Sequence, residues 1–196
     1  MEGTSLKRLL RSDVRQRRRG LDRDSRTAHD QAINLALLDL VERTGANSLA
    51  AFWSFDGEPD LGPALDILAR RGLQIALPVL VDESGGKGLR FQVWNPAETL
   101  VKNRFGIAEP GEGAEVSLCD LDLVLLPLVA WDDQGHRLGM GAGYYDRALA
   151  QLAKSSRPRR IGIAYDVQKV PEVPHDSWDV PLHEVITENG RFTCAA

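Results

Sequence analysis

The chain has 196 residues, a formal net charge of −4 at pH 7 and 43% hydrophobic residues. This length supports one full hydrophobic core and is short for two, so we expect a single domain over residues 1–196. The acidic balance argues against a general nucleic-acid binder, and no apolar stretch reaches the roughly 18 residues that a membrane span needs.

Cysteine usage and the basic N-terminus bear on the cellular compartment. Cys119 and Cys194 are far apart and have no metal-ligand spacing, which favours neither a disulfide scaffold nor a zinc site and fits a reducing cytoplasm. Residues 1–26 carry nine Lys or Arg against four acids, a composition that faintly resembles a transit peptide. The acids among them favour a structural helix and a cytoplasmic protein.

Residues 6–19 are predicted to form a basic helix. Its narrow apolar stripe comprises Leu6, Leu9, Leu10 and Val14. Lys7 and Arg11 are four residues apart, so they share a face and could bind one polyanion; the alternative is a solvated charged face. The remaining arginines are expected to be surface charge: Arg15, Arg17, Arg18 and Arg19.

The next segments alternate between helix and strand. Apolar spacing predicts a helix over residues 25–42, a strand over 48–55, a helix from about residue 61 to a glycine stop at 72, and a strand over 74–80. This βαβ order predicts an open sheet with right-handed crossovers and helices on both faces. Ligands of such sheets bind outside the carboxyl ends of the strands.

Two side chains stand where the first strand ends. Trp53 could stack on a flat heterocycle, and Glu58 could accept two hydrogen bonds from an amidine-like edge. Alternatively Trp53 is core and Glu58 begins a turn. Further on, residues 82–88 are predicted to be the turn of a hairpin and residues 103–110 an ordered turn, in which Phe105 either joins the core or walls a pocket.

The most informative stretch is residues 121–149. Residues 123–130 are apolar without polar alternation, which suits a strand buried on both faces, and the acidic stretch after them predicts a turn. In residues 139–143 every second residue is glycine, so the backbone can adopt positive φ and direct its N–H groups toward one anion. A predicted helix over residues 144–152 adds its dipole, and phosphate is the expected ligand.

Charged side chains flank this loop. Arg137 can fork onto phosphate oxygens, and Asp146 can hold Mg²⁺ against them. The alternative is a mobile loop or hairpin with a solvated Arg137 and an Asp146 that starts a helix. Residues 157–165 predict a turn and a strand, and Asp176 and Asp179 fall in an extended loop before a last strand. Either carboxylate near Asp146 would give Mg²⁺ a second anchor.

The segment RLGMGAGYYDR, with DLVLLPLVAWD upstream, closely resembles the signature of the 5-formyltetrahydrofolate cyclo-ligase family. KRLLR, WSFDGEPD, FGIAEP and DVPLHEVIT match the family in the same order, so the resemblance covers most of the chain. It implies an α/β fold: a three-layer, open, mostly parallel sheet with helices on both faces, similar to the sugar-phosphate isomerase and coenzyme A transferase folds.

The resemblance also implies roles for individual residues. The segment KRLLR and the signature loop would bind ATP, through Lys7, Arg8, Leu9, Leu10, Arg11, Arg137, Leu138, Gly139, Met140, Gly141, Ala142, Gly143, Tyr144 and Tyr145. Arg137 and Tyr145 would be catalytic, Trp53 and Glu58 would bind the folate, and Asp146 and Asp179 would hold Mg²⁺. Many relatives carry Lys or Gly where this chain has Ala142.

The family's reaction converts 5-formyltetrahydrofolate and ATP to 5,10-methenyltetrahydrofolate, ADP and phosphate. As the resemblance implies, the formyl oxygen attacks the γ-phosphorus, and N10 then closes the ring as phosphate leaves. The protein must mainly align the reactants and neutralise charge, so no general base is required. The expected ligands are ATP, Mg²⁺ and the folate with or without a polyglutamate tail; no nucleic acid or membrane is expected, and the chain is expected to be a monomer.

Three other interpretations remain open from the sequence. The chain could be a divergent paralogue that keeps the nucleotide loop without folate activity. It could be an RNA-associated module that uses its Arg-rich helix, although no aromatic RNA-binding strand motif is present. It could be a sugar-phosphate isomerase or coenzyme A transferase relative, since fold alone does not settle function.

Overall fold

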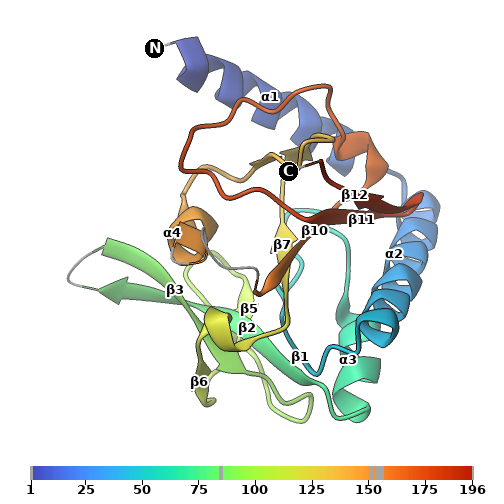
Figure 1. The fold of residues 1–196 in the computed structure, drawn as a ribbon, viewed down its shortest axis with the longest axis vertical. Helices are drawn as coiled ribbons and strands as arrows, with labels where there is room; N and C mark the ends of the chain where they lie inside the picture. Colours follow the sequence, from blue (N-terminus) through green and yellow to red (C-terminus); the bar gives the residue numbers. More distant parts are fainter. Residues whose placement is uncertain (1, 84–85, 151, 153–156, 196) are drawn as a thin grey trace.

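A computed structural model describes residues 2–83, 86–150, 152 and 157–195. Its centre is an eight-stranded sheet with the order β12-β11-β10-β7-β1-β2-β3-β6 (Figure 1). The strands are β1 (Ser48–Ala50), β2 (Gln74–Glu83), β3 (Gly86–Val93), β6 (Glu115–Val116), β7 (Leu123–Pro127), β10 (Arg159–Ile163), β11 (Glu184–Thr187) and β12 (Gly190–Thr193). The five strands from β11 to β2 are parallel, and antiparallel strands flank them on both sides.

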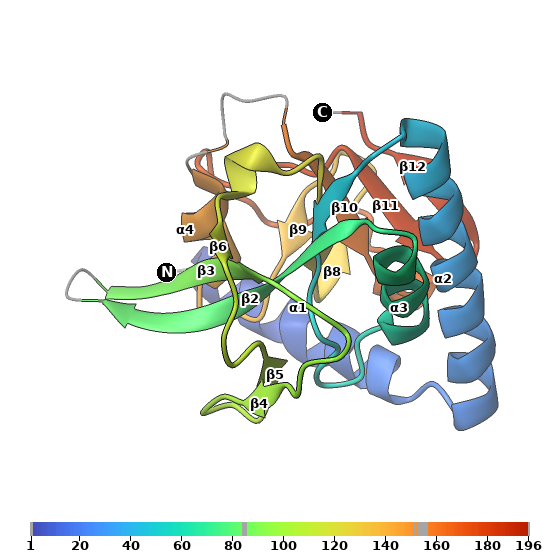
Figure 2. The same ribbon diagram turned by 90° about the horizontal axis from the view of Figure 1, so that it is seen from below.

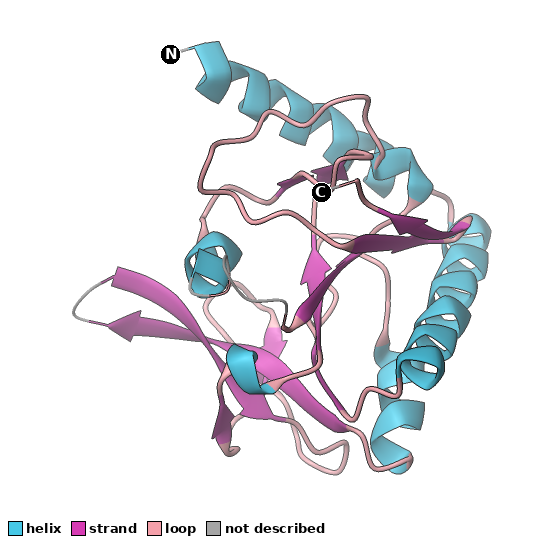
Figure 3. Ribbon diagram, in the orientation of Figure 1, coloured by secondary structure: helices cyan, strands magenta, loops and turns pink. Residues whose placement is uncertain are grey.

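Helices cover both faces of this sheet. α2 (Arg23–Thr44) and α3 (Gly62–Arg70) lie on one face, and α4 (Tyr144–Ala150) lies on the other (Figure 3). α1 (Glu2–Arg19) belongs to neither layer, because it crosses beyond the carboxyl end of β7 (Figure 1). The predicted three-layer α/β architecture with a mostly parallel sheet is confirmed, and α1 is its main addition.

The alternation of side chains along the strands explains the two cores. Leu123 and Leu125 face the helix pair α2 and α3, whereas Val124 and Leu126 face α4. Successive side chains of a strand point to opposite faces, so a strand with helices on both sides must be apolar throughout. The prediction of a strand buried on both faces, made from the continuous apolar run in residues 123–130, is therefore confirmed for residues 123–127.

Local sequence signals fix the ends of α2. The Asp22 carboxylate accepts hydrogen bonds from the backbone N–H groups of Asp24 and Ser25, which caps the first turn. Gly45 ends the helix with a φ of +63°, in the left-handed region that glycine adopts at little cost. The predicted span, residues 25–42, is correct to within two residues at each end.

Several boundaries differ from the expectation. The strand predicted over residues 48–55 ends at Ala50, and the chain beyond it turns at Asp56 and Gly57, which have φ values of +54° and +78°. The strand predicted over residues 123–130 ends at Pro127, and a hairpin of β8 (Ala130–Trp131) and β9 (Arg137–Leu138) follows. α4 ends at residue 150, and residue 151 lies outside the described residues.

Two hairpins frame the open end of the sheet. The predicted hairpin is confirmed as β2 and β3, which project beyond the rest of the sheet (Figure 2); its tip at residues 84–85 lies outside the described residues. The predicted ordered turn at residues 103–110 is confirmed between β4 (Val101–Lys102) and β5 (Ala108–Glu109). Among the described helices, none combines the length and apolar character of a membrane span.

The expectations for the face of α1 need two corrections. Leu6 and Leu9 are 55% and 62% exposed, and only Leu10 and Val14 of the predicted stripe pack against the protein. Arg18, expected to be surface charge, is completely buried. The helix crosses loops rather than lying flat on the sheet, so its buried stripe is narrower than an apolar pattern alone predicts.

Candidate active site

A cavity of about 460 Å³ opens at the carboxyl ends of β1 and β7, where open α/β sheets bind ligands. Its walls come from α1, the turn after β1, the β2–β3 hairpin, the turn between β4 and β5, the loop before α4, and the loop before β11. The residues that line it are Lys7, Arg11, Phe52, Trp53, Phe55, Glu58, Pro78, Leu80, Leu89, Asn103, Phe105, Ile107, Glu109, Pro127, Leu128, Arg137, Gly139, Met140, Gly141, Ala142, Gly143, Tyr144, Tyr145, Asp146, Asp176, Trp178 and Asp179.

The loop of residues 139–143 forms one wall of the cavity, and a cationic side chain of α1 contacts it. Nε of Arg11 donates a 2.8 Å hydrogen bond to the carbonyl oxygen of Gly139. Gly141 has a φ of +99°, and a Cβ added there would lie 3.3 Å from Cζ of Arg11. The backbone conformation therefore favours glycine at residue 141, where an added Cβ would also make the Arg11 side chain shift, while Gly139 has neither a positive φ nor an atom within 4 Å of an added Cβ.

Arg137 and Asp146 form the ion pair at the centre of the cavity. Nη2 of Arg137 lies 2.6 Å from Oδ1 of Asp146, and the arginine side chain is only 5% exposed. Its Nε is buried and has no hydrogen-bond partner among the described residues. Burial also lowers the pKa of Arg11, and the nearby Asp146 carboxylate opposes that shift. A buried guanidinium with an unused donor is suited to an incoming oxyanion.

The loop before β11 brings two further carboxylates to the N-terminal helix. Nζ of Lys7 lies 2.6 Å from Oδ2 of Asp176 and 4.0 Å from Oδ2 of Asp179. The backbone N–H of Asp176 donates to Oδ2 of Asp179 at 2.9 Å. The structure thus brings Lys7, the signature loop and Asp179 to one cavity, as the sequence predicted.

A divalent ion is the third element of the predicted nucleotide site. The described residues hold no group of three or more His, Cys, Asp or Glu side chains arranged to bind a metal. Mg²⁺ commonly takes only one or two carboxylates and completes its shell with water and phosphate oxygens. Asp146 and Asp179, which line the same cavity, fit that requirement.

Glu58 lines the same cavity, together with the aromatic side chains of Phe52, Trp53 and Phe55. Burial raises the pKa of Glu58 to about 7, although the Arg18 charge and a 3.1 Å hydrogen bond from the backbone N–H of Phe55 lower it. The pKa of Tyr145 is raised by burial and by the nearby Glu58 carboxylate. Trp53 packs against the core beside Trp94, with ring centroids 5.8 Å apart, and also reaches the cavity. Both interpretations of Trp53 from the sequence therefore describe part of its position.

Four predicted ATP-binding residues do not line the cavity. Arg8 and Leu9 face solvent, and Leu10 and Leu138 pack in the small core under α1. In the predicted ATP site, these four residues would act only through their backbone atoms or by holding neighbouring residues in place. Conversely, Phe105 is settled as a cavity residue, 48% exposed.

Several cavity residues escaped the sequence analysis. Among them, Asn103 donates to Glu109 at 3.0 Å across the base of the β4–β5 turn, and Trp178 is 71% exposed between the two loop aspartates. The only available signal was that Asn103 and Trp178 lie just before segments that resemble the family, FGIAEP and DVPLHEVIT, since neither the polar pair nor an isolated tryptophan forms a motif.

Comparison with known proteins was consistent over nearly the whole chain. The model of the 5-formyltetrahydrofolate cyclo-ligase family matches residues 3–188. The 5-formyltetrahydrofolate cyclo-ligase of Escherichia coli (strain K12) is 39% identical over 176 residues, which covers 89% of this chain and 96% of that protein. That of Mus musculus is 27% identical over 192 residues, 94% of this chain and 95% of the relative.

A solved structure agrees with the sequence comparisons. The NMR structure of 5,10-methenyltetrahydrofolate synthetase from Aquifex aeolicus is 32% identical, superposes with a TM-score of 0.81, and covers 97% of this chain and 94% of that one. The match thus extends to the arrangement of the elements that build the cavity. The chain therefore belongs to the 5-formyltetrahydrofolate cyclo-ligase family.

Proposed function

We propose that the cavity holds ATP at its cationic end and 5-formyltetrahydrofolate at its Glu58 end, and that phosphoryl transfer occurs where the two meet. Membership of the family makes the chain an enzyme, a ligase of folate one-carbon metabolism that cyclises 5-formyltetrahydrofolate to 5,10-methenyltetrahydrofolate, and implies the use of ATP. The observation that carries the proposal is that both predicted folate contacts and most of the predicted ATP contacts line one cavity.

The cationic side chains and the loop backbone indicate where the nucleotide would bind. Lys7 and Arg11 from α1 face the loop around Gly141, and Arg137 presents a buried guanidinium beside them. These groups would bind the triphosphate and offset the charge that spreads over the transferring phosphoryl group. Asp146 and Asp179 would hold Mg²⁺, which would supply further positive charge to offset that of the phosphates.

The flat side chains and hydrogen-bonding groups around Glu58 indicate where the folate would bind. The ionised Glu58 can accept two hydrogen bonds from the amidine-like edge of a pterin, while Trp53 and Phe105 offer flat apolar surfaces. Tyr145, whose raised pKa keeps its hydroxyl protonated, can donate a hydrogen bond near the reacting formyl group. Residues 1–196 would carry this activity as one domain.

The proposed reaction has two steps. The formyl oxygen attacks the γ-phosphorus, the bond to the β-phosphate oxygen breaks, and ADP leaves. N10 then attacks the activated formyl carbon, the carbon–oxygen bond breaks with loss of phosphate, and the N10 proton passes to solvent. Because phosphorylation converts a poor leaving group into a good one, the protein contributes alignment and charge rather than a strong base.

The test is a direct assay of the purified chain. With 5-formyltetrahydrofolate and MgATP, we expect methenyl-folate absorbance to rise and one ADP to form for each product molecule. Omission of either ATP or the folate should abolish both signals. ATP binding without methenyl-folate formation would instead identify a paralogue that has lost folate activity, and the absence of both would reject the proposed site.

A further inference from the structure

The turn that carries Glu58 has an unusual backbone. Asp56 has a φ of +54°, the one positive value among the described non-glycine residues, and Gly57 follows with +78°. The backbone N–H of Glu58 donates to the carbonyl oxygen of Phe55 at 3.0 Å, which closes the turn. A non-glycine residue rarely holds this conformation unless surrounding contacts impose it.

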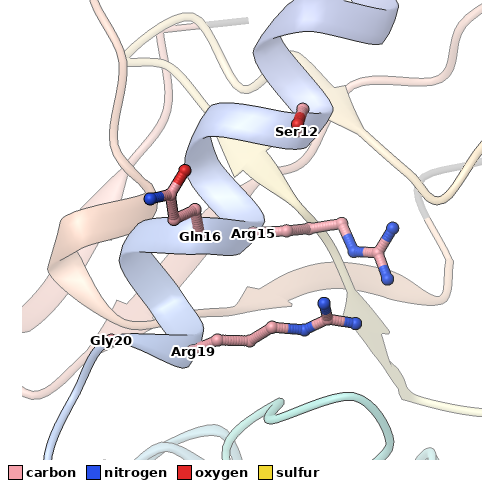
Figure 4. A pocket seen from close by; sticks show the side chains of 5 residues that line it. All are labelled: Ser12, Arg15, Gln16, Arg19 and Gly20. Atoms are coloured by element: carbon pink, nitrogen blue, oxygen red, sulfur yellow. The ribbon is translucent and has the colours of Figure 1, made fainter.

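Arginines from α1 supply those contacts. Nε of Arg15 donates to Oδ2 of Asp56 at 2.9 Å, and Nε of Arg19 donates to its Oδ1 at 2.9 Å. The two side chains extend in the same direction from one face of α1 (Figure 4). Nη1 of Arg26, from α2, donates to the carbonyl oxygen of Gly57 at 2.8 Å, so two helices hold the turn.

Arg18 makes the contact that reaches farthest into the protein. Its Nη2 donates to both the carbonyl oxygen and Oδ2 of Asp56 at 3.0 Å, and its Nη1 donates to the carbonyl oxygen of Leu128 at 3.2 Å. Its side chain is 0% exposed and that of Asp56 is 8% exposed. Leu128 follows β7 and lines the cavity, so this one side chain ties the turn after β1 to the end of the neighbouring strand.

The same helix reaches both ends of the cavity. Lys7 and Arg11 in its first half face the loops proposed to bind the nucleotide, and Arg18 in its second half holds the Glu58 turn. We propose that Arg18 and Asp56 are positioning residues, whose ion pair fixes the Glu58 carboxylate in the cavity at a set place relative to the cations of α1. This inference rests on the proposed folate contact of Glu58.

The charge of Arg18 gives the inference a distinctive consequence. Burial raises the pKa of Glu58 to about 7, Arg18 lowers it, and Asp56 in the same turn raises it. Tyr145, which approaches from α4, remains neutral because its pKa is raised. Removal of the Arg18 charge should therefore raise the pKa of Glu58 further, and folate binding that needs the carboxylate should require a higher pH.

The experiment compares three variants with the parent enzyme: Arg18→Met, Asp56→Asn and the control Arg17→Met. Arg17 is an exposed neighbour on α1 that forms an ion pair with Asp13 on the same helix. Each variant is checked by circular dichroism and thermal unfolding, and KM for 5-formyltetrahydrofolate, KM for ATP and kcat are measured from about pH 6 to 9. The same substitution of Arg18 is repeated in a Glu58→Gln background.

We expect Arg18→Met to raise KM for the folate roughly tenfold at pH 7, to leave KM for ATP within about twofold, and to move the pH dependence of the folate KM toward higher pH. Arg17→Met should match the parent. In the Glu58→Gln background the pH shift should vanish, because the titrating group is gone. If Arg18→Met does not fold, Asp56→Asn, which keeps the side-chain shape, provides the same comparison of folate and ATP KM.

Three results would overturn the inference, and the failure of the positioning role can be told apart from the failure of the folate contact. If Glu58→Gln raises the folate KM but Arg18→Met and Asp56→Asn do not, Glu58 binds folate without help from the ion pair. The same holds if the pH shift persists in the Glu58→Gln background. If Glu58→Gln itself leaves the folate KM unchanged, the proposed folate contact fails, and the positioning role fails with it.

Discussion

At the scale of single residues, the charged side chains of the cavity form ion pairs with one another. Arg137 is bound to Asp146 at 2.6 Å, and Lys7 is bound to Asp176 at 2.6 Å. Arg137 is almost fully buried whereas the Asp146 side chain is 39% exposed, so the carboxylate is the partner with freedom to turn. A nucleotide that arrives with a cation would replace the Arg137–Asp146 pair by a cation–phosphate contact and a metal–carboxylate contact, and its phosphates would compete with Asp176 for Lys7.

This arrangement predicts the effect of Asp146→Asn. The substitution keeps the shape of the side chain but removes the charge that would hold Mg²⁺ during phosphoryl transfer, so kcat should fall by about 100-fold or more while KM for the folate changes by less than about threefold. Steady-state kinetics at saturating Mg²⁺ provide the measurement. Asp133→Asn is the matched control, because Asp133 pairs with Lys169 and does not line the cavity. Near-normal turnover of Asp146→Asn would exclude a metal role.

The residue scale also shows why Arg18 was misjudged from the sequence. Lys7, Arg11, Val14 and Arg18 are spaced by four, three and four, so they lie along one face of α1, and that face is the one that meets the protein. The helical spacing in the sequence was therefore sufficient to place Arg18 on the face of α1 that meets the protein. Its burial was not predictable, because a buried guanidinium requires a partner, and Asp56 lies 38 residues away in a turn of unusual conformation.

At the scale of elements, the three glycines of the loop differ in how strongly the backbone requires them: Gly141 and Gly143 have positive φ values of +99° and +69°, whereas Gly139 does not. Gly141→Ala forces a side chain into the left-handed region beside Arg11, at a cost of about 1–2 kcal/mol. Because the strain falls on the loop proposed to meet the phosphates, KM for ATP should rise roughly tenfold with a smaller change in KM for the folate. Gly139→Ala adds the same methyl group without strain or contact and should have a much smaller effect. Equal effects of the two substitutions would show that backbone conformation at residue 141 does not matter for ATP.

Elements were predictable where one local pattern decides them. Asp22 and Gly45 indicate where α2 begins and ends, and the uninterrupted apolar run of residues 123–127 indicates β7. Boundaries failed where tertiary contacts are involved. The segment after β1 leads into a sharp turn at Asp56 that arginines from α1 hold, and β8 and β9 pair with each other instead of extending the sheet. The local sequence contains no trace of those partners.

At the scale of the whole molecule, the topology brings distant loops together. β1 and β7 are adjacent parallel strands, so the turns after them open at the same edge of the sheet, and α1 closes over that edge from the N-terminus. The contact between Lys7 and Asp176 spans 169 positions of sequence. The sequence identified the right segments through the family resemblance and the strand order rule, but it could not specify which side chains would meet, since that depends on how the loops pack.

Glu58 imposes a stability cost on the whole molecule that can be measured without any ligand. The pKa of Glu58 is raised from 4.5 to about 7, so between these values the folded state binds the proton that the unfolded chain has already released. Stability from this group is therefore fully present below about pH 4.5 and is lost as pH rises toward 7.

Glu58→Gln should remove that cost. Urea unfolding of the ligand-free variant should give a free energy of unfolding about 1–3 kcal/mol above the parent at pH 8, with the difference vanishing near pH 4.5. Glu112→Gln, at an exposed position outside the cavity, should follow the parent at every pH. A Glu58→Gln variant no more stable than the parent at pH 8 would mean that Glu58 ionises as freely in the folded state as in the unfolded chain. The predicted gain fits a carboxylate kept for a ligand rather than for the fold, because such groups destabilise the empty protein.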